Sequence, residues 1–270
     1  MLTCAALALV AEPGRAQSAG DSLFQFGWIH IQPRLSNSAP RNRLRPNVLF
    51  APLGIEDSFR SASVRLRTSS VDTLGLIFKH FLTDHWAVNL SLGIPPKTAL
   101  SARGTVGPTG PTRPANSLDI GREDLNPVGS ARQWAPALLV EYHFRDADDV
   151  WRPFIGIGVS YVFFTEVEIN NNFARAINQQ FGAPLALLAG RPGPTRVTAD
   201  AEDAFAPAFA AGMNLRLSSR WSLTSSVGFA PLQTTATLTL DAQDGTRLAR
   251  SRTRLSSDAL IYNLLAGFRF

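Results

Sequence analysis

The sequence contains very little cysteine, lysine and charge for its length. Among 270 residues there is a single Cys, at position 4, and the 26 basic residues include only two lysines, Lys79 and Lys97. A single Cys excludes a disulfide scaffold, because a bridge needs two. Charged residues make up 17 % of the chain, below the roughly 25 % usual in soluble domains. A mean hydropathy of +0.01 excludes an intrinsically disordered chain, which would be far more polar.

Long apolar runs are also scarce. No segment beyond the N-terminus approaches the roughly 18 consecutive apolar residues that a transmembrane helix needs. The apolar run Leu2–Ala11 is followed by Gly14 and Ala16, small residues placed as a signal peptidase requires for cleavage after Ala16. This pattern predicts a signal peptide over residues 1–16 and a single domain over residues 17–270, although the basic residues that usually begin a signal are missing. The alternative is an ordinary N-terminal segment.

Alternation of apolar and small or polar residues with period two recurs along the chain. In the last run, one face carries only apolar side chains: Leu260, Tyr262, Leu264, Ala266, Phe268 and Phe270. A strand places alternate side chains on opposite faces, so each such run predicts a strand with one apolar face. Eight strands are predicted, at residues 23–31, 73–81, 86–94, 136–144, 155–163, 205–215, 221–229 and 260–270.

The size of the apolar side chains indicates which face points outward. The other face is crowded with Gly, Ala, Ser and Asn. The alternation by itself also fits a soluble lipocalin-like barrel with its bulky residues inside. However, an eight-stranded barrel has an interior just wide enough to be filled by side chains, and this many Phe, Trp, Tyr and Leu residues would overfill it. Pointing outward into lipid, they fit. We therefore expect an all-β fold, an eight-stranded antiparallel transmembrane β-barrel of the outer membrane.

The connections alternate between short and long. Residues 82–85, 145–150 and 218–220 are short turns, whereas residues 32–68, 95–133, 165–203 and 232–258 are long. Outer-membrane barrels have short periplasmic turns and long external loops, so the four long segments are expected outside the cell. Three tryptophans begin a strand directly after a short turn, which predicts an aromatic girdle at the lipid interface. Its expected members are Trp86, Trp151, Trp221, Phe268 and Phe270.

Four stretches resemble the OmpW family of Gram-negative outer-membrane proteins. They are Thr73-Leu-Gly-Leu-Ile-Phe78, Phe81-Leu-Thr-Asp-His85, Trp151-Arg-Pro-Phe-Ile-Gly-Ile-Gly-Val-Ser-Tyr161 and Ala266-Gly-Phe-Arg-Phe270. The resemblance covers residues 23–270, with divergent long loops. It implies a monomeric barrel whose narrow lumen admits small hydrophobic solutes passively and releases them sideways into the membrane, with no catalytic residues and no cofactor. The terminal Phe270 also resembles the signal that barrel-assembly machinery recognises. The alternative is a structural or surface-interaction barrel, such as an adhesin, receptor or envelope tether.

Several polar and small residues are expected to line the lumen. They are Lys79, Asn89, Ser91, Glu141, His143, Asn214, Arg216, Gly228 and Asn263. A charge inside a barrel needs a partner, so Glu141 is expected to pair with Lys79 or Arg216, and His143 is close enough in sequence to share a hydrogen bond with it. No His has a second metal ligand at a suitable spacing and no nucleophile accompanies His143, so neither a metal site nor an enzyme is predicted.

Arginine recurs with period two in the long segments. The clearest set is Arg250, Arg252 and Arg254, which would line one face of an extended segment. Guanidinium groups bind phosphate through two hydrogen bonds, and the external leaflet of an outer membrane carries phosphorylated lipid A. The hypothesis is that these residues contact lipopolysaccharide; the alternative is a solvated loop face. Nucleic acid is not an expected partner, because the chain has no aromatic–basic interleaving and no reading helix.

Overall fold

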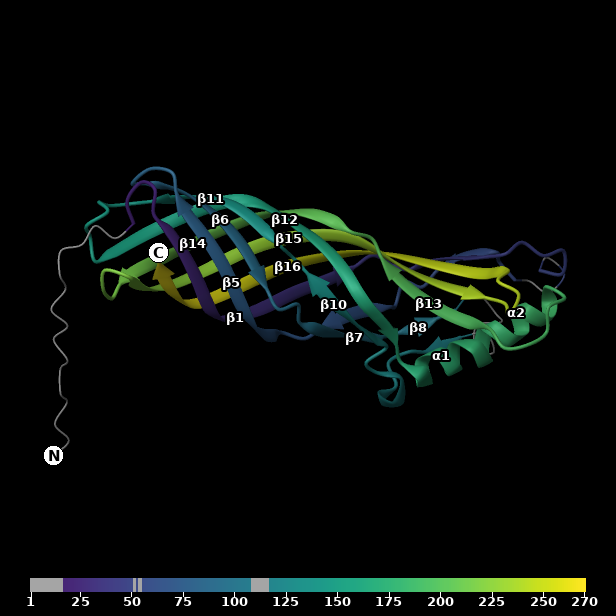
Figure 1. The fold of residues 1–270 in the computed structure, drawn as a ribbon. Coiled ribbons are helices and arrows are strands. Elements are labelled where there is room, and N and C mark those ends of the chain that lie inside the picture. The colour runs from purple at the N-terminus through teal and green to yellow at the C-terminus, as the bar shows by residue number, and fades with distance from the viewer. Residues whose placement is uncertain (1–16, 51, 53–54, 108–116) are drawn as a thin grey trace, which may run out of the picture.

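A ring of eight antiparallel strands forms the body of the protein (Figure 1). The structure, a computed structural model, describes residues 17–50, 52, 55–107 and 117–270; the predicted signal peptide, residues 1–16, lies outside the described residues. The ring strands are β1 (Ser22–Asn37), β5 (Val71–Phe81), β6 (Trp86–Gly93), β11 (Ala137–His143), β12 (Trp151–Ile169), β14 (Ala204–Arg216), β15 (Trp221–Asp241) and β16 (Arg247–Arg269).

The ring closes by pairing the first strand with the last. In β1 and β16, Leu23 lies opposite Arg269, and the register continues to Asn37 opposite Leu255. On the other side, β11 pairs with both β6 and β12, so every strand of the ring pairs with a neighbour on each side over at least part of its length. Closure satisfies the backbone groups that lipid cannot. The prediction of an eight-stranded antiparallel barrel is confirmed.

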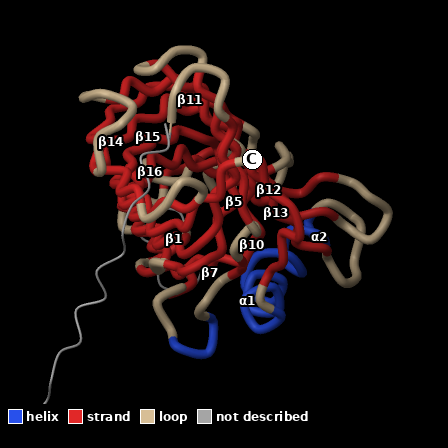
Figure 2. Tube along the Cα trace, turned by 60° about the vertical axis from the view of Figure 1, so that its left-hand side comes forward, coloured by secondary structure: helices blue, strands red, loops and turns tan. Residues whose placement is uncertain are grey.

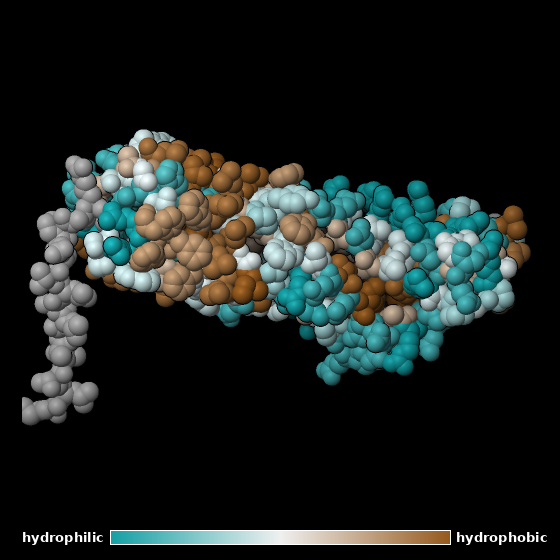
Figure 3. Space-filling model, in the orientation of Figure 1, coloured by the Kyte–Doolittle hydropathy of each residue, from teal (hydrophilic) through white to brown (hydrophobic). Residues whose placement is uncertain are grey.

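The barrel carries its large apolar side chains on the outside. Trp28, Leu138 and Ile157 are 48 %, 51 % and 61 % exposed, whereas the residues that alternate with them are buried or half-buried. On the face drawn in Figure 3, hydrophobic side chains gather over the half of the molecule that holds the short turns and the C-terminus. We call the exposed apolar side chains of the ring strands the apolar belt. An exposed belt of this kind is the surface that a bilayer covers.

Beyond the belt the barrel continues as a long extension, which departs from the expected loops. Residues 232–258 were predicted as the fourth long loop, but most of them belong to β15 and β16, whose pairing runs on to Leu240 opposite Ala249. The expectation of an irregular connection was wrong here, because alternation continues through this segment: Leu238, Leu240 and Ala249 face inward into an apolar cluster, and Arg250, Arg252 and Arg254 face outward.

The rest of the extension is built from short elements. Its strands are β2 (Arg41–Leu44), β3 (Ser58–Arg60), β4 (Arg65–Thr68), β7 (Lys97–Arg103), β8 (Thr105–Val106), β9 (Leu118–Asp119), β10 (Gly129–Trp134) and β13 (Arg196–Ala201). Its helices are the 3₁₀ turn η1 (Glu123–Leu125), α1 (Asn171–Ile177), the π-helical η2 (Asn178–Gly182) and α2 (Ala183–Leu188), gathered on one side of the strands in Figure 2. Phe173, Ile177 and Leu125 pack together with β-strand residues in its apolar core. None of the helices in the described ranges is long and apolar enough to cross a membrane.

Candidate functional site: a closed lumen with a break in the wall

A buried ion pair lies in the lumen at the level of the apolar belt. Lys79 Nζ of β5 lies 2.6 Å from Glu141 Oε2 of β11, and both side chains are 1 % exposed. Asn89 donates a hydrogen bond to Glu141 Oε1 (2.5 Å), and His143 Nε2 lies 3.1 Å from Oε2. Two charges this deep are tolerated only when they are paired and hydrogen-bonded, and here both carboxylate oxygens have partners.

A second buried cation lies closer to the periplasmic turns. The guanidinium of Arg152, on β12, donates hydrogen bonds to the backbone carbonyl oxygens of Gln17, Asp84 and Arg145. It also lies over the ring of Phe81, with 5.7 Å between Cζ and the ring centroid. These contacts tie the chain before β1 and two turns to the inside of the barrel. Together with the ion pair they fill the periplasmic half of the lumen, and we call this set of residues the floor.

The predicted lumen residues occupy three levels. Six of them line the cavity above the floor: Lys79, Asn89, Ser91, Glu141, Gly228 and Asn263. His143 and Asn214 are buried below it. Arg216 lies at the periplasmic rim and donates to a carbonyl oxygen in the turn between β11 and β12. Of the two partners left open for Glu141, Lys79 is the one in contact.

Sequence reasoning missed the part of the floor that β12 contributes. The alternating run was followed only from Ile155, although Trp151 was expected to begin this strand, so Arg152 and Phe154 were not named as lumen residues; both share a face with the inward Gly156. A backward extension of the period-two pattern to Trp151 would have found them. Gln25, which donates to Thr224 Oγ1 (2.7 Å) across the lumen, was missed for the same kind of reason, since β1 alternates only weakly.

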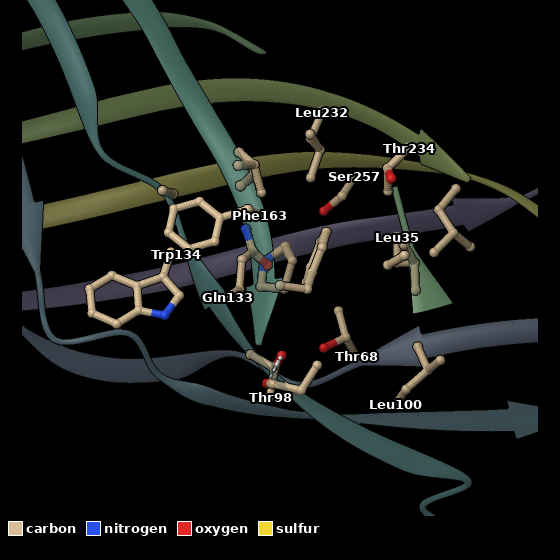
Figure 4. Close-up of a pocket in the computed structure, with 18 of the residues that line it drawn as sticks. Leu35, Thr68, Thr98, Leu100, Gln133, Trp134, Phe163, Leu232, Thr234 and Ser257 are labelled. Carbon is tan, nitrogen blue, oxygen red and sulfur yellow. Dashed lines mark hydrogen bonds between the residues drawn. The ribbon is translucent and has the colours of Figure 1, made fainter. Parts of the chain in front are cut away.

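Above the floor, a cavity of about 810 Å³ runs into the extension. It begins at the Lys79–Glu141 pair and ends below α1 and α2, where Phe173, Ile177 and Leu185 line it. Figure 4 shows side chains from the opposite sides of its middle section around a common space: Leu35, Thr68, Thr98, Leu100, Gln133, Leu232, Thr234 and Ser257. Trp134 and Phe163 stack on each other at one side of it. Aliphatic and aromatic groups with a few hydroxyls make this a space suited to a small apolar molecule.

The wall beside this cavity is interrupted on one side. Pairing of β6 with β11 ends at Ser91 opposite Ala137, and pairing of β7 with β10 begins at Lys97 opposite Arg132. Between these two ladders, one backbone hydrogen bond joins the facing segments in the described part of the chain. It is long, with 3.4 Å from the Gln133 nitrogen to the carbonyl oxygen of Pro96. We call the interval between residues 92–96 and 133–136 the wall break.

The sequence of the wall break explains why the strands do not pair there. Pro95, Pro96 and Pro136 fall within it, and proline has no N–H to donate to a ladder. All of residues 92–96 and 133–136 line the cavity, so the wall break borders the cavity directly. On the outer surface Ile94 and Leu138 are 53 % and 51 % exposed, which places the wall break at the edge of the apolar belt.

Two ion pairs hold the strands together just beyond the wall break. Lys97 Nζ lies 2.7 Å from Glu168 Oε2, and Arg132 Nε lies 2.6 Å from Glu166 Oε2. The hydrogen bond from Lys97 and its positive charge lower the pKa of Glu168 below its usual value, so this carboxylate is ionised at neutral pH. These side-chain ion pairs therefore link β7, β10 and β12 directly above the wall break, where the backbones of the facing segments do not form a ladder.

Comparison with known proteins points to one family. The sequence matches the model of the OmpW family over residues 53–183. Outer membrane protein W of Vibrio cholerae is 23 % identical over 263 residues, which cover 97 % of this chain and 94 % of that protein. The chain is similar to the OmpW family, by the family model over its middle part and by this relative over almost its whole length. Its location in the outer membrane, expected from the apolar belt and the connection lengths, is confirmed by this similarity.

Solved outer-membrane barrels have the same fold as this protein. The crystal structure of OprG from Pseudomonas aeruginosa superposes with a TM-score of 0.67 at 17 % identity, covering 95 % of this chain and 99 % of OprG. The solid-state NMR structure of the outer membrane protein AlkL in lipid bilayers gives a TM-score of 0.51 at 17 % identity, covering 100 % and 97 %. At this identity the likeness concerns the fold alone.

The aromatic residues expected at the lipid interface lie near the end of the barrel that holds the short turns. Trp86, Trp151 and Trp221 are the first residues of β6, β12 and β15, and each is 45–47 % exposed. Phe268 packs edge-on against Trp221, with 5.2 Å between ring centroids, and Phe270 is 70 % exposed. Their exposure and common level are those that an aromatic girdle requires, and their contact with the bilayer interface stays a prediction.

Proposed function

We propose that this barrel is a passive channel that admits small hydrophobic molecules from outside the cell and releases them through the wall break into the membrane. The observation that carries the proposal is an apolar cavity that is closed below by charged residues and bordered at its side by unpaired strands. Within the part of the chain that the structure describes, the wall break gives a small apolar molecule in this cavity an apolar way out toward the lipid.

The floor supports lateral release over passage into the periplasm. A solute that continued downward would have to displace the Lys79–Glu141 pair and the buried Arg152, and separating buried charges is costly. At the wall break, by contrast, no ladder of hydrogen bonds has to be broken. The route through the wall therefore requires the smaller rearrangement.

The channel is tested by uptake into lipid vesicles that contain the folded protein. A small aromatic or alkane solute is supplied outside, and its appearance in an enclosed sensor enzyme or dye is followed over time. We expect uptake well above that of protein-free vesicles for the apolar solute and not for a polar solute of equal size. A structural or surface-interaction barrel, the alternative function, would give the same rate as protein-free vesicles for both.

The wall break is tested by narrowing it. Ala135 lies on its rim, is exposed and borders the cavity. Ala135→Trp is expected to cover the opening and to lower uptake about tenfold, because an indole ring occupies space beside the wall break that a methyl group leaves open. Ala211→Trp, on the lipid-facing surface of β14, is the matched control and should keep the wild-type rate. Equal rates for the two variants would contradict release at this position.

The proposal also includes the oligomeric state of the barrel and the way it is recognised during assembly. We propose that the barrel works as a monomer, since its ring is closed within one chain, and that it involves no catalytic step. The exposed Phe270, at the end of β16, is proposed as the residue that barrel-assembly machinery recognises. Its ring contacts Phe78 with a centroid distance of 6.3 Å and is otherwise accessible.

A further inference from the structure

The outer face of the extension carries arginines from three neighbouring strands. Arg250, Arg252 and Arg254 of β16 are all exposed, as the period-two pattern predicts. Strand pairing adds residues far away in the sequence: Arg43 lies opposite Arg250, Arg41 opposite Arg252, and Arg60 of β3 opposite Arg41. These residues are the arginine lattice: Arg41, Arg43, Arg60, Arg250, Arg252 and Arg254.

The spacing of the lattice is that of the sheet itself. Directly paired residues are about 5 Å apart across strands, and residues two positions apart on one strand are about 7 Å apart. Paired side chains leave the sheet on the same face, so Arg60, Arg41 and Arg252 form one row across three strands. Like charges placed directly opposite each other destabilise a sheet unless a counter-charge lies between them.

The protein supplies no such counter-charge to the lattice within the residues that the structure describes. None of the six guanidinium groups takes part in an ion pair there. Asp200 is the carboxylate nearest to Arg252 along its row, two strands away beyond Thr237. The hydroxyl side chains of β15, Thr235, Thr237 and Thr239, flank the lattice on that side. The surface therefore offers guanidinium donors to an anion, and the exposed carboxylates nearest to it on the β3 side are Glu56 and Asp57, which form no ion pair with the lattice within the described residues.

The height of the lattice above the apolar belt indicates which anion it meets. Leu260 is the last apolar residue on the outer face of β16 before the exposed Asp258. Arg254 follows after about 20 Å of strand and Arg250 after about 33 Å. With the usual strand tilt of outer-membrane barrels, these distances correspond to about 15–25 Å above the apolar belt. The phosphates of lipid A lie directly on the acylated sugars, below this level, whereas the saccharide core carries its phosphates further out.

We propose that the arginine lattice binds the phosphate groups of the lipopolysaccharide core. Each phosphate accepts hydrogen bonds from two or more neighbouring guanidinium groups, and the rows across β16, β2 and β3 let one core bridge several arginines. Binding neutralises the like charges of the lattice and fixes β2 and β3 against β16. The proposal concerns the outside of the extension and does not depend on the transport of any solute.

The experiment measures binding of two lipopolysaccharides to the folded, full-length barrel in detergent micelles. One carries a phosphorylated heptose core, and the other ends at Kdo and retains only the lipid A phosphates; inorganic phosphate is the third probe. We expect the wild type to bind the phosphorylated core at least about tenfold more tightly than the Kdo form, with a preference that weakens as salt is added. The variant Arg250→Gln/Arg252→Gln/Arg254→Gln should bind both forms equally, and the corresponding lysine variant should keep part of the preference.

A second triple variant controls for the loss of three positive charges. Arg122→Gln/Arg175→Gln/Arg191→Gln removes exposed arginines of the same extension that contact Asp124, Asn172 and Asp244, and it should keep the wild-type preference. Heat-modifiable migration in gels verifies that each variant is folded. The proposal is overturned if the wild type binds both lipopolysaccharides equally, if the two glutamine variants lose the preference alike, or if inorganic phosphate binds as tightly as the core.

Discussion

The variant Ser257→Trp is expected to reduce uptake of a small apolar solute to the rate of vesicles without protein. Ser257 lies on β16 opposite Leu35 of one neighbouring strand and Leu232 of the other, and it points into the middle of the cavity (Figure 4). An indole ring at this position fills the cavity between its extracellular end and the wall break, so a solute can no longer pass from one to the other. The rate of uptake into vesicles measures the effect.

The neighbouring residue provides a matched control. Ser256→Trp introduces the same side chain one position earlier, and alternation along the strand turns it to the outer face. Its uptake should equal that of the wild type. If Ser257→Trp is folded and still transports the solute, then the cavity is not the route and the channel proposal fails.

The sequence predicts the barrel well because lipid enforces a simple pattern. Phe, Trp and Leu must face outward and small or polar residues inward, and a one-residue error in register would reverse both faces. Residues such as Leu138 and Glu141 could therefore be assigned to the lipid and the lumen before their positions were known. The same rule finds Lys79, since a lysine between Phe78 and a histidine on an alternating strand must point inside.

The extension and the wall break could not be predicted from this alternation of lipid-facing and lumen-facing residues. Above the bilayer, strands face water on one side and a small apolar core on the other, so the contrast between faces is weaker and Leu232 to Asp258 looks like a loop. The wall break depends on which strands stop pairing with each other. Pro95, Pro96 and Pro136 indicate turns in the sequence, but only the register shows that they face one another across β6 and β11.

Arginines far apart in the sequence were brought together by pairing alone. Arg41 and Arg252 are separated by more than two hundred residues and lie directly opposite each other because β1 and β16 close the ring and β2 continues beside β16. The period of each segment predicts one row of charges. The number of rows depends on the topology, which no local pattern contains.

The variant Lys79→Met is expected to cause the largest loss of stability in the barrel. It leaves the carboxylate of Glu141 buried with hydrogen bonds from Asn89 and His143 but without its cation, and removing one partner of a buried ion pair costs about 3–5 kcal/mol. The free energy of unfolding in urea, followed by tryptophan fluorescence in detergent or lipid, measures this loss. His85→Gln, in the turn before β6, is a control that should change it little.

The double variant Lys79→Met/Glu141→Gln separates the charge effect from the loss of packing. A glutamine keeps the size of Glu141 and its acceptor for Asn89, so the double variant should be more stable than Lys79→Met by about 2 kcal/mol or more, because no unpaired charge remains buried. If both variants are equally unstable, the buried charge of Glu141 does not cause the loss of stability.

The same double variant also tests the route of the solute. Because release through the wall does not cross the floor, its uptake should stay at the wild-type rate, whereas a marked change would mean that the solute passes between Lys79 and Glu141.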